Sequence, residues 1–120
     1  MITRSVHVMY YVSDMKRSQA FYRDVLGLKP KHEHAEWTEY ELAGGPSLAL
    51  HPGLKARPQG GAVLGVEVED IKEARKKLEA AGVKVPHDFH GIPGGVILDI
   101  LDPDGYTIEL VQYTKKQGTW

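Results

Sequence analysis

The sequence predicts an α+β fold in which two βαβββ repeats form a small half-barrel of mixed sheets around an open cleft. First, residues 12–16 (Val-Ser-Asp-Met-Lys) resemble residues 68–72 (Val-Glu-Asp-Ile-Lys). Second, an alternating apolar stretch precedes each copy, as expected for a half-buried strand. Third, each copy begins a helical pattern that ends at a glycine, Gly27 or Gly82. A repeat of this length indicates two copies of one supersecondary unit.

The first module, at about residues 4–52, begins with a strand over residues 6–12. Asp14 is placed to cap a helix over about residues 14–26, whose apolar stripe faces the sheet. Three further strands are expected at residues 29–34, 37–42 and 47–51. On the first strand, the residues predicted to face the core are Val6, Val8, Tyr10 and Val12.

The second module, at about residues 62–113, repeats this order. Asp70 caps a helix over about residues 70–81 and has Glu73 three positions later, as in a capping box. Residues 102–105 (Asp-Pro-Asp-Gly) are typical of a type I turn. Strands are predicted at residues 63–68, 83–87, 96–101 and 107–113, a loop at residues 91–95, and a linker between the modules at residues 53–61.

Length and composition are those of one soluble domain, which we place at residues 1–120. The chain has no cysteine, which excludes disulfides, thiolate metal sites and cysteine nucleophiles. Lys and Arg number 15 against 16 Asp and Glu, and this balance argues against a nucleic-acid partner. We see no signal peptide and no apolar run of membrane-spanning length, so we expect a cytoplasmic protein that does not bind membranes.

Strand parity also predicts which side chains face away from the helices and into the cleft. Polar groups at such positions need a partner, a metal or water. In the first module these residues are His7, Met9, Tyr11, Ala49 and His51, joined by Trp37, Glu39 and Glu41 if Tyr40 and Leu42 stay in the core. In the second module they are Val63, Gly65, Glu67, Ile97, Asp99, Thr107, Glu109, Val111 and Tyr113. His32 and His34 alternate on one strand, and we interpret them as a solvated edge.

Four stretches carry a resemblance to a known family: residues 6–9 (Val-His-Val-Met), 12–15, 21–27 (Phe-Tyr-Arg-Asp-Val-Leu-Gly) and 102–110. Over about residues 4–113 the chain resembles the vicinal oxygen chelate superfamily. Its members include glyoxalase I, extradiol dioxygenases and the fosfomycin- and bleomycin-resistance proteins. The resemblance implies the two-module fold, a small-molecule ligand and a homodimer. It implies no single activity, because this fold hosts many chemistries.

In the metal-dependent members, the first strand of each half supplies a histidine and the last strand a glutamate. By this resemblance the four positions fall on His7, Ala49, Val63 and Glu109. Only two of the four, His7 and Glu109, carry side chains that bind metals. His51 lies two residues beyond Ala49 on the same face, and its reach makes it a candidate third ligand.

Two functions stay open. One is a metal-dependent lyase, isomerase or dioxygenase, in which one divalent ion (Zn, Ni, Mn or Fe) polarises a substrate oxygen. The other is a metal-free protein of the bleomycin-resistance type that binds a drug or toxin. The candidate metal ligands are His7, Glu109 and His51. The candidate catalytic carboxylates are Glu109, Glu67 and Asp99. The candidate substrate contacts are Met9, Tyr11, Trp37 and Tyr113, of which the last two offer stacking surface.

Overall fold

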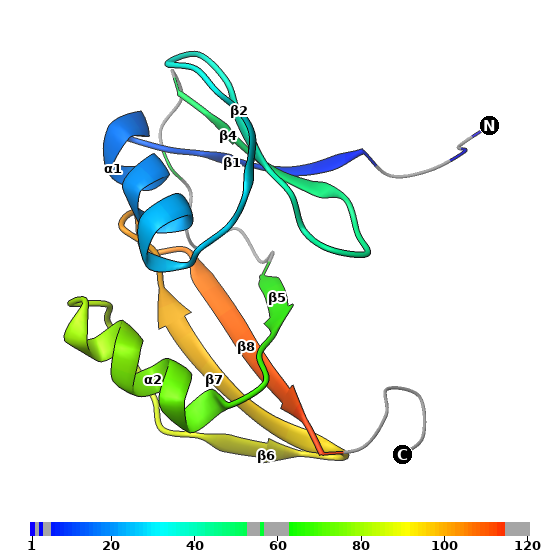
Figure 1. Ribbon diagram of the computed structural model, residues 1–120, viewed down its shortest axis with the longest axis vertical. Coiled ribbons are helices and arrows are strands. Elements are labelled where there is room, and N and C mark those ends of the chain that lie inside the picture. Colours follow the sequence, from blue (N-terminus) through cyan, green and yellow to red (C-terminus); the bar gives the residue numbers. More distant parts are fainter. Residues whose placement is uncertain (2, 4–5, 53–55, 57–62, 115–120) are drawn as a thin grey trace. The chain divides into compact units, whose positions relative to one another are not determined.

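The computed structural model describes residues 1, 3, 6–52, 56 and 63–114. The chain forms two compact units, residues 1–57 and 58–120 (Figure 1). Nearly all of the predicted linker, residues 53–61, lies outside the described residues. Within the described part of the chain, no helix is long and apolar enough to cross a membrane.

The first unit contains one four-stranded mixed sheet in the order β1-β4-β3-β2. The first strand pairs in parallel with the last, and the other two pairings are antiparallel. A helical segment links the first two strands and lies on one side of the sheet (Figure 1). The elements are β1 (His7–Tyr11), α1 (Met15–Gln19), η1 (Ala20–Val25), β2 (Pro30–Glu33), β3 (Thr38–Tyr40) and β4 (Ser47–His51).

The second unit repeats this topology, with the sheet order β5-β8-β7-β6 and parallel pairing of its first and last strands. The two βαβββ modules predicted from the repeat are therefore confirmed. The elements are β5 (Leu64–Glu67), α2 (Ile71–Ala80), β6 (His90–Ile92), β7 (Gly95–Leu101) and β8 (Thr107–Tyr113).

Both predicted helices are present, with one change in the first. Its second half, η1, is a π-helix, in which the Leu26 amide donates to the Phe21 carbonyl oxygen at 2.9 Å. The second helix has the expected N-cap, because the Asp70 carboxylate accepts from the Glu73 amide at 3.0 Å. The amide of Ile71 donates to the Gln112 side chain at 2.8 Å, which ties this helix end to β8.

The prediction of a strand at residues 83–87 is wrong. Within residues 83–87, only Lys84 forms a β-bridge, and its partner is Leu101. The strand that pairs with β7 at the edge of the second sheet is β6. Pro86 has no amide hydrogen to donate to a ladder. Gly94 takes a φ of +79° after Pro93, which suits a tight turn and turns the predicted 91–95 loop into a β6–β7 hairpin.

The core of the first unit lies between its helical segment and one face of its sheet. Tyr22 from η1 is fully buried, and its ring centre lies 6.3 Å from that of buried Tyr40. The Tyr40 hydroxyl donates to Glu33 at 2.6 Å, and Arg23 binds the same carboxylate at 3.0 Å. Burial and the neighbouring Glu33 raise the pKa of Tyr40, so this hydroxyl stays a donor at physiological pH.

The predicted burial of β1 is only half correct. Tyr10 and Val12 are buried, but Val6 and Val8 are 57% and 39% exposed. The helical segment lies beside the C-terminal end of β1, and the strand's N-terminal half extends past it (Figure 1). Two large apolar side chains therefore stay uncovered on an edge strand.

Gly95 is the position at which the second sheet tolerates a side chain least. A Cβ at Gly95 would lie 2.5 Å from the Gln112 carbonyl oxygen and 3.3 Å from the Tyr113 Cα. We expect Gly95→Ala to lower the free energy of unfolding by about 1–3 kcal/mol, because the ladder must shift. Gly91→Ala in the paired strand meets open space and is the matched control. Urea unfolding measures both, and an equal effect of the two substitutions would contradict this packing.

Candidate functional site

The uncovered face of the first sheet has a row of three aligned residues at its centre. Met9 pairs with Ala49, and Ala49 pairs with Glu39 on its other side. Residues directly opposite one another on neighbouring strands project to the same face. The predicted parity is thus confirmed for this sheet, with Tyr40 and Leu48 buried on the opposite face.

The indole of Trp37 contacts two histidines and Glu39 on this face. Its ring centre lies 5.2 Å from that of His7 and 5.9 Å from that of His51, both in edge-on contacts. His7 pairs with Ser47, so these two histidines lie on opposite sides of Ala49 along the sheet. Ala49, which lies between these two positions on β4, has only a methyl side chain and is fully buried.

A hydrogen bond fixes the orientation of this indole. Trp37 Nε1 donates to Glu39 Oε1 at 2.8 Å. This bond is the largest cause that holds the pKa of Glu39 below its usual range; burial acts against it, and Ser47, Lys31 and His7 add to the lowering. Lys31 Nζ in turn donates to Ser47 Oγ at 2.8 Å. Glu39 is therefore an ionised acceptor in the middle of the face.

The ring of His51 is also fixed in orientation and tautomer. Its Nδ1 contacts the carbonyl oxygen of Pro52, and a carbonyl only accepts, so Nδ1 carries the proton. Nε2 then keeps its lone pair in the neutral ring. The Tyr11 ring meets His51 edge-on, with 5.9 Å between ring centres. We name the group Tyr11, Trp37, His7, His51 and Glu39 the Trp37 cluster.

The uncovered face of the second sheet is acidic instead. Glu109 pairs with Gly65 on one side and with Asp99 on the other, which sets two carboxylates opposite one another. Glu67 lies further along this face, opposite Val111, and is exposed. Among the described residues, Asp99 Oδ1 is buried without a hydrogen-bond partner. Two opposed carboxylates offer acceptor oxygens to a cation or to a hydrogen-bond donor of a ligand.

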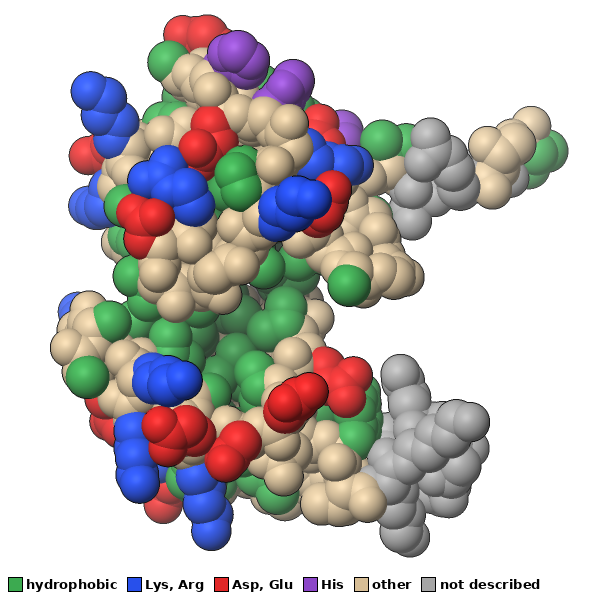
Figure 2. Space-filling model, viewed as in Figure 1, with side chains coloured by type: hydrophobic (Ala, Val, Ile, Leu, Met, Phe, Trp, Pro, Cys, Tyr) green, Lys and Arg blue, Asp and Glu red, His purple; other side chains and the backbone are tan. Residues whose placement is uncertain are grey.

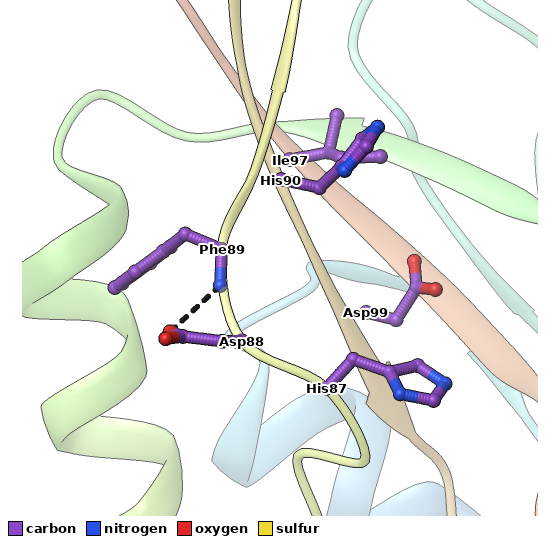
Figure 3. Close-up of a pocket in the computed structure, with 6 residues that line it drawn as sticks. All are labelled: His87, Asp88, Phe89, His90, Ile97 and Asp99. Atoms are coloured by element: carbon purple, nitrogen blue, oxygen red, sulfur yellow. Dashed lines mark hydrogen bonds between the residues drawn. The ribbon is translucent and has the colours of Figure 1, made fainter.

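A pocket of about 460 Å³ opens beside Asp99 (Figure 3). His87, His90 and Asp99 project to one side of β6 and β7. Phe89 projects to the other side, toward α2, and its amide donates to the Asp88 carboxylate at 2.8 Å. The two histidines thus flank Asp99, which the sequence predicted as a catalytic carboxylate. The sequence did not predict this arrangement, because it wrongly placed a strand at residues 83–87.

The sequence-predicted site residues therefore fall into two groups. The structure brings His7, Tyr11, Trp37 and His51 together in one unit and Asp99 next to Glu109 in the other. Met9 belongs to the first face, while Tyr113 lies at the end of β8 opposite Gly95. His7 and Glu109 belong to different units, so their predicted proximity stays a prediction. Sequence reasoning missed Lys31, which the β2 irregularity between Pro30 and His32 brings to Ser47.

These residues do not fit the four-ligand ion of the superfamily. Two of the four positions are Ala49 and Val63, which have no donor atom. His7 pairs with Ser47 and His51 pairs with Tyr11, so the two histidines lie at different ends of the β1–β4 ladder. No group of three or more histidine or carboxylate side chains among the described residues is arranged to hold a metal.

Comparisons with known proteins agree with this architecture. A family profile described as Glyoxalase/Bleomycin resistance protein/Dioxygenase superfamily matches residues 4–110. The chain is similar to a lactoylglutathione lyase of Salmonella typhimurium, at 33% identity over 91% of this chain and 92% of that protein.

Two solved structures share the fold. One, from Agrobacterium tumefaciens, is a protein of unknown function with a TM-score of 0.79 and 26% identity, over 93% of this chain and 95% of that one. The other is TnmS3, an antibiotic binding protein from Streptomyces sp. CB03234, with a TM-score of 0.77 and 24% identity over 93% and 97% of the two chains. At this level of identity the second likeness shows the fold alone.

The charge of Glu39 makes stability depend on pH. Its pKa in the folded protein lies below the ordinary value of 4.5. The contribution of Glu39 to the free energy of unfolding is therefore complete above the pKa that it has in the unfolded chain. That contribution is lost as the pH falls through the lower pKa that it has in the folded protein. Glu39→Gln keeps an acceptor for the indole but not the charge. We expect it to cost about 1 kcal/mol at pH 7 and progressively less as the pH falls below about 4.

Urea unfolding followed at pH 7 and pH 3.5 measures this difference. Glu41→Gln, which changes an exposed glutamate just past the same strand, is the matched control and is expected to have little effect at either pH. A cost of Glu39→Gln that stays constant from pH 7 to 3.5 would contradict the role of the charge.

Proposed function

Because this chain belongs to the Glyoxalase/Bleomycin resistance protein/Dioxygenase superfamily, we propose that it binds a small planar organic molecule on the Trp37 cluster without a resident metal. The observation that carries this proposal is the indole in ring contact with both His7 and His51. The Trp37–Glu39 hydrogen bond holds the ring in place before a ligand arrives. Such preorganisation lowers the side-chain conformational entropy that is lost when a ligand binds.

The chemistry of the cluster favours a particular class of ligand. Aromatic rings bind flat ligands through offset or edge-on contacts. The ionised Glu39 favours a ligand that carries a positive charge or a hydrogen-bond donor. His51 Nε2 is a further acceptor, because Nδ1 is occupied by Pro52. We therefore propose a flat heteroaromatic ligand with a cationic or donor group.

A second candidate function is a metal-dependent enzyme of the lactoylglutathione lyase type. The curated relatives carry that name at about one-third identity over nine-tenths of this chain. His7 and Glu109 are retained, and the paired carboxylates Asp99 and Glu109 suit proton transfer. This function requires His7 and Glu109 to meet across the two units, with His51 or water in place of the missing ligands. A weakly held Zn, Ni, Mn or Fe ion would then supply the Lewis acid.

Replacing the indole tests the binding function. We expect Trp37→Leu to weaken binding of planar heteroaromatic cations by about tenfold or more, because stacking surface and the fixed ring are both lost. Calorimetric titration with a panel of such cations and uncharged rings of the same shape measures this, with Trp120→Leu, the other tryptophan, as control. Glu39→Gln should weaken only the cations. Failure of every panel member to bind, or equal binding by Trp37→Leu, would contradict the proposal.

Metal titration separates the two candidate functions. The binding function predicts that His7→Ala leaves uptake of Zn, Ni, Mn and Fe(II) unchanged. The enzyme function predicts weak uptake that falls in His7→Ala, because His7 is the retained histidine ligand. Calorimetry at pH 7.5 on the parent and the variant measures the difference. Loss of uptake in His7→Ala would favour the enzyme.

We also propose a homodimer. Val6, Val8 and Val63 are exposed, on or beside the edge strands β1 and β5. Uncovered apolar side chains at sheet edges favour association. Light scattering at micromolar concentration is expected to give twice the mass of the chain, and the mass of a single chain would contradict this.

A further inference from the structure

The β2 edge of the first sheet carries a second cluster of histidines, His32 and His34. Both side chains are exposed, and Figure 2 shows histidine side chains gathered over the β2–β3 hairpin. The two ring centres lie 5.0 Å apart, with the planes at 77°. Neither residue belongs to the Trp37 cluster or to the superfamily's metal positions.

We propose that His32 and His34 chelate one divalent transition metal ion, with Cu²⁺ bound most tightly and Ni²⁺ and Zn²⁺ less so. His32 lies in β2 and His34 directly follows the end of that strand. Residues i and i+2 of extended backbone project to the same side, so we expect one ion to reach both imidazoles. Metal–nitrogen bonds of about 2 Å place the centres of two rings on one ion about 4.5–5 Å apart. The observed separation of 5.0 Å between the ring centres agrees with this range.

The backbone on which the pair stands is held in place by its neighbours. The amide of His34 donates to the Trp37 carbonyl oxygen at 3.1 Å, which closes the hairpin. The His34 carbonyl oxygen accepts from Thr38 Oγ1 at 3.0 Å and from the Gln19 side chain at 3.4 Å. His32 pairs with Glu39 in the ladder. The two Cα positions are thus fixed before an ion binds, which favours chelation over single-site binding.

The ligand set decides which ions bind. Imidazole nitrogen suits Cu, Ni and Zn, and affinity among divalent ions rises toward Cu²⁺. Ca²⁺ and Mg²⁺ prefer oxygen ligands and have none from the pair itself. Water completes the coordination, in agreement with the lack of a three-residue metal group in the described part of the chain. Uptake of metal by this chain therefore has a source that is independent of His7.

Copper titration of single variants tests this inference. We expect calorimetry in a weakly coordinating buffer at pH 7.5 to show one Cu²⁺ per chain at this site. Either His32→Gln or His34→Gln should lower the affinity by at least about tenfold, because loss of one arm removes the chelate effect. The double variant should bind no more tightly than the single ones. Glu36→Gln, which changes an exposed side chain in the same hairpin but no histidine, is the matched control.

Electron paramagnetic resonance of the bound Cu²⁺ gives a second readout, which is expected to show two coupled imidazole nitrogens in the parent and one in each single variant. Unchanged affinity in both His32→Gln and His34→Gln would overturn the proposal, as would an equal loss in Glu36→Gln. Repeating the titration with His7→Ala keeps the two proposals apart. If His32 and His34 form the site, the His7→Ala variant is expected to bind Cu²⁺ as tightly as the parent, whatever ligand the Trp37 cluster takes.

Discussion

Parallel pairing of the first and last strand in each unit decides where every candidate functional side chain lies. It forces a crossover, which the helical segment provides, and that segment covers one face of the sheet. The other face keeps its alternate residues uncovered by the unit's own helix. His7 and His51 reach the same face of the first sheet because β1 and β4 run side by side. Glu109 reaches the corresponding face of the second sheet because β8 lies beside β5.

Much of this was predictable from the sequence. The repeat around Asp14 and Asp70 predicts the two modules, because both carboxylates cap helices and local hydrogen bonding decides such positions. Strand parity places His7, Tyr11 and His51 on one face, since the side-chain period of a strand is fixed at two. The resemblance to the superfamily identifies Ala49 and Val63 as positions that lack a metal donor.

The remaining features depend on contacts that no periodicity encodes. The edge strand lies at β6 rather than at the predicted residues 83–87 because the chain turns at Gly94. The positive φ of Gly94 sets the register of the β6–β7 hairpin, and the apolar pattern of the sequence does not encode it. Val8 has the right parity for burial but lies where the helix does not reach. The position of the Trp37 indole depends on one hydrogen bond to Glu39 and on ring contacts with His7 and His51.

The placement of the Trp37 indole in contact with both His7 and His51 carries the proposed binding site. Nuclear Overhauser spectroscopy tests it most directly, because edge-on rings with centres 5.2 and 5.9 Å apart bring ring protons close together. We expect cross-peaks from the Trp37 ring protons to the ring protons of both histidines. Cross-peaks to neither histidine would show that the indole turns away from the face, and would contradict the account.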